Sequence, residues 1–152
     1  MMDIDNRLPK ITLGAEWGPD ASSRVPVVRS KLHGHRGIGG YDPRRVEFVR
    51  LDPPYYHFPV SCATEAQAQG IKEAFARAEC LRNPDDLRQV AFTVLPGHGC
   101  VIAEKWVPGK VPFEVMWEYM DAGYLDVVKP VPQGSMEYLP DADGKSVLRA
   151  DQ

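Results

Sequence analysis

Cysteine is scarce in this sequence, and its spacing argues against an architecture held together by disulfides. The chain has 152 residues and three cysteines, Cys62, Cys80 and Cys100. An odd number of cysteines without a C-x-x-C pair indicates free thiols, which persist in a reducing compartment. We therefore expect a cytoplasmic protein that folds without covalent cross-links.

The sequence also lacks a long apolar run and a secretory signal. Its strongly apolar stretches, such as residues 90–95, are about a third of the length that a membrane-spanning helix needs. The first residues, Met-Met-Asp-Ile-Asp-Asn, are acidic and polar where a signal peptide has basic and then apolar residues. We expect neither export nor membrane association.

Internal repeats, low-complexity tracts and a P-loop are absent as well, because no Gly-Lys-Ser/Thr follows a glycine-rich stretch. The segment Gly34-His35-Arg36-Gly37 resembles the G-x-x-G loop with which KH domains clamp a nucleic-acid backbone. That loop requires a helix on both sides, and the glycines and proline at residues 39–43 cannot begin one. These glycines are therefore interpreted as turn residues.

What the sequence does contain is typical of one globular domain. Its apolar fraction is 43% and its charged fraction 26%, and its length allows one well-buried core. The net charge of −3 is unevenly spread, because residues 24–50 hold seven basic and two acidic side chains while acidic residues gather between 111 and 143. The two halves either neutralise each other within the fold or leave a positive face that steers a partner.

The first part of the chain has the composition of an arm. Residues 1–44 contain six glycines and four prolines, and no helical or strand periodicity is sustained there. Such a segment predicts an extended arm with tight turns. We expect residues 45–140 to form the core domain and residues 141–152 to form a polar tail.

Local patterns beyond residue 44 predict strands and helices. Thr64 followed by Gln67 matches a helix capping box, and Gly123 after an apolar helical stripe matches a C-terminal cap. The turn at residues 96–99 separates two apolar runs, as in a β-hairpin. The expected elements are strands at 45–51 and 55–60, a helix after Thr64, paired strands at 89–95 and 100–107, a helix at 111–122, and edge strands at 125–131 and 135–139.

This order, β-β-α-β-β-α-β from residue 45, predicts an α+β fold in which two helices pack on one face of a small antiparallel sheet. The apolar positions of these elements should form a single core. We expect that core to contain Phe48, Phe58, Ile71, Phe75, Val90, Phe92, Val94, Ile102, Phe113, Met116, Trp117 and Met120.

The histidines are candidates for a metal site. His33 and His35, two residues apart, could place both imidazoles on one ion if the backbone is extended, and His98 stands at the same spacing from Cys100. All the histidines nevertheless fall in expected turns or at strand ends, and no acidic residue is spaced among them. We therefore expect no bound metal and no cofactor, and keep a small metal-dependent hydrolase around His33, His35, His57 and His98 as a second alternative.

Other catalytic arrangements are not predicted. Glu114, Glu118 and Asp121 share one face of the expected second helix, which is typical of a solvated surface. Cys62 precedes the expected first helix, but no acid-oriented histidine accompanies it. We expect no catalytic residue.

Arginine and aromatic side chains interleave in the basic part of the chain. Such mixtures are typical of protein-interface hot spots and of surfaces that stack single-stranded nucleic acid. We expect a non-enzymatic assembly, adaptor or inhibitor subunit that binds another protein, or a second copy of itself, through the arm and segment 24–58. A nucleic-acid-binding module using segment 24–50 is the first alternative, disfavoured by the negative net charge. The expected interface residues are Arg36, Tyr41, Arg44, Arg45, Tyr55 and Tyr56.

Overall fold

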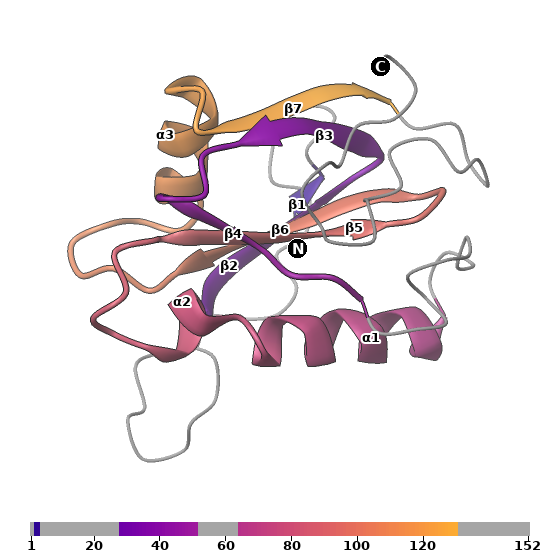
Figure 1. Ribbon diagram of the computed structural model, residues 1–152, viewed down its shortest axis with the longest axis horizontal. Helices are drawn as coiled ribbons and strands as arrows, with labels where there is room; N and C mark the ends of the chain where they lie inside the picture. The colour runs from indigo at the N-terminus through magenta and orange to yellow at the C-terminus, as the bar shows by residue number, and fades with distance from the viewer. Residues whose placement is uncertain (1, 4–27, 52–63, 131–152) are drawn as a thin grey trace.

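The computed structural model describes residues 2–3, 28–51 and 64–130, and these ranges form a layered α+β fold (Figure 1). The expected α+β class is confirmed. The elements are β1 (Met2–Asp3), β2 (Val28–Gly34), β3 (Arg36–Tyr41), β4 (Val46–Phe48), α1 (Glu65–Ala76), α2 (Glu79–Arg82), β5 (Val90–Leu95), β6 (Gly99–Lys105), α3 (Glu114–Asp121) and β7 (Leu125–Pro130).

The main sheet has five strands in the order β1-β2-β6-β5-β4, and β3 pairs with β7 in a separate two-stranded sheet. The centre of the main sheet, β2-β6-β5, is antiparallel, and it contains the predicted β5-β6 hairpin. At its edges β1 runs parallel to β2, and β4 runs parallel to β5. The sheet is therefore antiparallel at its core and parallel at its margins.

The helices lie on opposite faces of the main sheet, which corrects the expectation that both pack on one face. Figure 1 shows α1 and α2 below the sheet and α3, with the β3-β7 ribbon, above it. The physical reason is that every residue of β5 and β6 is buried, so both faces need an apolar cover. Phe92 packs in the apolar cluster between the sheet and α3, whereas Ala91 packs in the apolar cluster between the sheet and α1.

Part of the expected arm forms regular structure. Residues 28–41 build β2 and β3, and β2 alternates buried and half-buried positions as it pairs with β6. Strand β2 was not predicted because its buried residues alternate with the polar residues Arg29, Lys31 and His33, and because glycines follow the strand directly. Residues 4–27, the expected strands at 55–60 and 135–139, and the expected tail lie outside the described residues.

Both predicted helix signals are confirmed. The Thr64 hydroxyl accepts a hydrogen bond from the backbone N–H of Gln67 at 3.2 Å. At the end of α3, Gly123 has a φ of 82°, and the backbone N–H of Tyr124 donates to the carbonyl of Tyr119 at 2.9 Å. These contacts define a Schellman cap, and the rings of Tyr119 and Tyr124 pack edge to face across it.

The expected core residues are confirmed wherever the structure describes them. Phe48, Trp117 and Met120 are partly buried against the cluster beneath α3, and Phe58 lies outside the described residues. No helix in the described ranges is long and apolar enough to cross a membrane. The fully or largely buried members are Ile71, Phe75, Val90, Phe92, Val94, Ile102, Phe113 and Met116.

Candidate metal centre

Three histidines from separate parts of the chain meet at one end of the main sheet. His33 lies in β2, His35 follows it at the bend into β3, and His98 lies in the turn between β5 and β6. One ring nitrogen of each lies within 4.8 Å of the others. Figure 1 shows the β2-β3 bend and the β5-β6 turn at the same end of the sheet.

The strand register accounts for this meeting. Because β2 and β6 are antiparallel, the end of β2 lies beside the start of β6, with His33 opposite Val101. The three imidazole rings then stand with their centroids 4.7 to 5.2 Å apart. Two histidines therefore come from one strand end, and the third comes from the hairpin that pairs with it.

A glycine permits the close approach of the two backbones. A Cβ atom at Gly99 would lie 2.0 Å from the carbonyl oxygen of Gly34 and 2.7 Å from the Cα of His35. Gly99 also has a φ of +114°, which side-chain-bearing residues rarely adopt. Glycine at this position thus brings the His98 turn against the backbone of His35.

One of the three imidazoles is already oriented by a hydrogen bond. The Nδ1 atom of His33 lies 3.0 Å from the backbone carbonyl oxygen of Cys100. A carbonyl can only accept, so Nδ1 carries a proton in this hydrogen bond. Metal-binding histidines in proteins usually have such an outer partner, because it fixes the tautomer and the ring orientation.

The burial of the cluster suits a site with one accessible side. His98 is buried, with 2% of its surface exposed, whereas His33 and His35 are half-buried. In a tetrahedral zinc site with Zn–N bonds of about 2.0–2.1 Å, ligand nitrogens lie about 3.3 Å apart. The three nitrogens, which lie within 4.8 Å of one another, would have to approach by up to about 1.5 Å to share one ion.

The structure thus joins three of the four histidines of the metal-site alternative. His57 lies outside the described residues. The proposed pairing of His98 with the Cys100 thiol is not formed, because Cys100 packs in the apolar cluster beneath α3 and contacts His33 through its carbonyl. The spacing of His33 and His35 was the sequence signal for this site, whereas the role of Gly99 in bringing His98 close was not predicted.

The expected interface residue Tyr41 is half-buried and packs against the core. Its ring stands edge to face with that of Phe92, at 5.1 Å between centroids. Arg36 reaches across the small sheet and donates a hydrogen bond to the carbonyl of Val128 at 3.1 Å. Both side chains therefore have a role in joining β3 to its neighbours.

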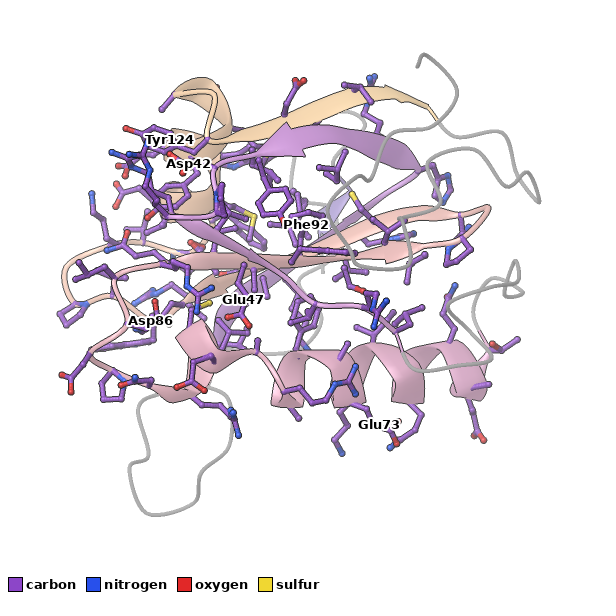
Figure 2. All side chains as sticks on the ribbon, viewed as in Figure 1. Asp42, Glu47, Glu73, Asp86, Phe92 and Tyr124 are labelled. Carbon is purple, nitrogen blue, oxygen red and sulfur yellow. The ribbon has the colours of Figure 1, made fainter. Side chains whose placement is uncertain are left out.

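Arg45 and Arg44 flank an aspartate. The Arg45 guanidinium lies 4.2 Å from the centre of the Tyr124 ring and 2.6 Å from the Asp42 carboxylate. Figure 2 shows Asp42 and Tyr124 side by side, and the hydrogen bonds of Arg44 and Arg45 lower the pKa of Asp42 to about 2. The Arg44 side chain is 83% exposed. Partner binding stays a prediction, and Tyr55 and Tyr56 lie outside the described residues.

A buried carboxylate elsewhere in the fold has a structural role. Glu104 accepts hydrogen bonds from the backbone N–H groups of Phe113 at 2.6 Å and Val115 at 3.2 Å, at the start of α3. Burial raises the pKa of Glu104 to about 7, and these hydrogen bonds oppose the increase. Glu104 is five residues along β6 from Gly99, or about 16 Å, and so does not belong to the histidine cluster.

Comparisons with known proteins add no functional information. No protein-family model, no curated protein and no solved structure matches this chain. The assignment of the site therefore depends on its geometry and chemistry.

Proposed function

We propose that this protein binds one divalent transition-metal ion, zinc by ligand preference, through His33, His35 and His98, and that the bound ion supports hydrolytic chemistry. The observation that carries the proposal is the convergence of the three ring nitrogens within 4.8 Å. Structural zinc sites use four protein ligands, whereas catalytic sites use three and leave one position open. Within the described ranges the cluster offers three ligands, which matches the second composition.

The protein groups supply what such chemistry requires. Neutral imidazoles leave the full positive charge on the ion, and zinc held by three histidines lowers the pKa of a bound water to about 7. The hydrogen bond from His33 to the Cys100 carbonyl fixes one ligand before the ion arrives. The buried position of His98 limits solvent on one side of the site.

The free-thiol interpretation supports a cytoplasmic location for this activity. Neither Cys80 nor Cys100 forms a disulfide in the described part of the chain, and both are buried. In a reducing compartment these thiols would stay as they are. We therefore propose that metal is acquired from the cytoplasmic pool.

The direct test is metal titration of chelator-treated protein. Isothermal titration calorimetry should show one zinc per chain, and His33→Ala, His35→Ala and His98→Ala should each weaken the affinity by at least about 100-fold. Arg44→Ala is the control, because this exposed side chain lies outside the cluster. His57→Ala tests a fourth ligand. Wild-type protein without stoichiometric zinc binding would refute the proposal.

The hydrolytic half of the proposal has its own test. Zinc-loaded protein should hydrolyse an activated ester such as p-nitrophenyl acetate faster than the chelated protein, and His98→Ala should abolish the difference. Cobalt substitution should give visible absorption that reports the coordination number. Tight zinc binding without hydrolysis of any activated ester would support the metal site but contradict the catalytic role of the bound ion.

A further inference from the structure

The chain passes from one sheet to the other at the histidine cluster. Strand β2 ends at Gly34 in the main sheet, and β3 begins at Arg36 in the two-stranded sheet with β7. His35 is the single residue between these strands, and it lies at a bend. Figure 1 shows β3 and β7 as a layer above the main sheet. The direction in which β3 leaves the main sheet is therefore set at one of the three histidines.

The other two histidines belong to the main sheet. His33 lies in β2 and is paired with β6, and His98 lies in the turn that joins β5 to β6. The backbone N–H of His98 donates to the carbonyl of Leu95 at 2.9 Å and closes this turn. The close approach at Gly99 places the turn against the backbone of His35. An ion shared by the three imidazoles would therefore tie the crossover residue to two fixed points of the main sheet.

The β3-β7 ribbon has a weak pairing of its own. Three of the six residues of β3, Arg-Gly-Ile-Gly-Gly-Tyr, are glycine, which weakens a strand because it offers no side chain to pack. The ladder between β3 and β7 shifts register between Arg36 and Ile38 and again between Ile38 and Gly40. A two-stranded sheet is at best marginally stable by itself. The ribbon therefore depends on what holds it to the rest of the fold.

The ribbon covers part of the apolar core. Ile38 of β3 is 0% exposed and Leu125 of β7 is 1% exposed, and both pack in the apolar cluster between the sheet and α3. At the end of the ribbon away from the histidines, the backbone N–H of Asp42 donates to the carbonyl of Tyr124 at 2.9 Å. At the other end, β3 leaves the crossover at His35. Lifting of this second end would let water reach the apolar cluster.

We propose that metal binding regulates the β3-β7 ribbon: the three-histidine site holds the ribbon closed over the core when it is occupied and lets it open when it is empty. This inference rests on the proposed metal site. In the closed form His33, His35 and His98 all reach the ion. When the ribbon lifts at its histidine end, the backbone of His35 turns with β3, and its imidazole leaves the other two.

The size of this coupling follows from the ligands. The open form keeps His33 and His98 but loses His35, and we expect the loss of one histidine ligand to weaken zinc binding by at least about 100-fold. Because the linkage between binding and a conformational equilibrium is reciprocal, saturating zinc lowers the equilibrium constant for opening by the same factor. Metal depletion thus exposes the apolar cluster, and metal binding covers it.

Hydrogen exchange followed by mass spectrometry measures the opening of the ribbon. In chelator-treated protein, the amides of β3 and β7 should exchange at least about tenfold faster than those of β5 and β6, because they open locally. Saturating zinc should slow the β7 amides by at least about 100-fold. In His35→Ala, zinc at a concentration that occupies His33 and His98 should change the β7 rates by less than about threefold. Glu73→Ala is the matched control and should respond as wild type, because Figure 2 shows this exposed side chain of α1 pointing away from the sheet.

The outcomes separate this inference from the metal proposal. If wild-type protein binds zinc but its β7 amides slow by less than about tenfold, the regulation of the ribbon is refuted and the metal site stands. The same conclusion follows if the β3 and β7 amides of the metal-free protein exchange as slowly as those of β5 and β6. Equal slowing in His35→Ala and wild type would assign the effect to general stabilisation and would also overturn the inference. If zinc itself does not bind, the metal proposal and this inference fail together.

Discussion

Replacing Gly99 with alanine tests the geometry on which the metal centre depends. The new Cβ would lie 2.0 Å from a backbone oxygen, which cannot move aside as a flexible side chain can. A strained backbone conformation costs about 1–3 kcal/mol, and overpacking typically costs about 1–3 kcal/mol more. We expect Gly99→Ala to lower the free energy of unfolding by about 3–4 kcal/mol.

The same change should separate the histidines. To relieve the clash, the turn that carries His98 must move away from the backbone of His35, and zinc affinity should fall by at least about tenfold. Gly40→Ala is the matched control, because a Cβ at Gly40 meets nothing within 4 Å. We expect it to lower the free energy of unfolding by about 0.5 kcal/mol or less. Urea unfolding and zinc titration measure the two effects. Unchanged stability and affinity in Gly99→Ala would refute the close approach.

Three further predictions concern the rest of the fold. Phe92→Ala should lower the free energy of unfolding by about 3–5 kcal/mol in urea titrations, because its ring is fully buried between β5 and the β3-β7 layer. Wild-type stability should include a contribution of up to about 3 kcal/mol that is lost as pH rises from about 4.5 through 7, because the folded state holds the Glu104 proton more tightly than the unfolded state. Glu104→Gln should remove that contribution from thermal melts across this range. Single-stranded oligonucleotides should show no binding at low salt, whereas steeply salt-dependent binding abolished by Arg44→Ala/Arg45→Ala would promote the nucleic-acid alternative.

The elements that the sequence predicted correctly are those whose causes are local. The Thr64 cap, the Gly123 cap and the β5-β6 hairpin each depend on a few neighbouring residues. Burial of both faces of β5 and β6 was also visible as apolar residues at successive positions. Because both faces are buried, each face needs its own cover, and the helices lie on opposite faces of the sheet. This arrangement was not predicted.

The meeting of the three histidines could not be predicted with the same reasoning because it depends on a distant pairing. His33 and His98 meet only because β2 pairs with β6, and residues 28–34 were assigned to an arm with no place in the sheet. In β2 the polar side chains Arg29 and Lys31 alternate with buried ones, which hides the strand in a Gly/Pro-rich context. Once that strand is placed, the histidine spacing becomes informative.

Strand β6 illustrates why geometry, rather than a shifted pKa, identifies the site. Glu104, near one end of β6, is buried and has a pKa raised to about 7, a shift that is typical of catalytic acids. Its oxygens are nevertheless occupied by the backbone N–H groups that begin α3, so its carboxylate is committed to the fold. At the other end of β6, the Cys100 carbonyl accepts a hydrogen bond from His33 and so orients its ring. His33, with this orienting partner and two neighbouring imidazoles, has the surroundings that metal-binding histidines in proteins usually have.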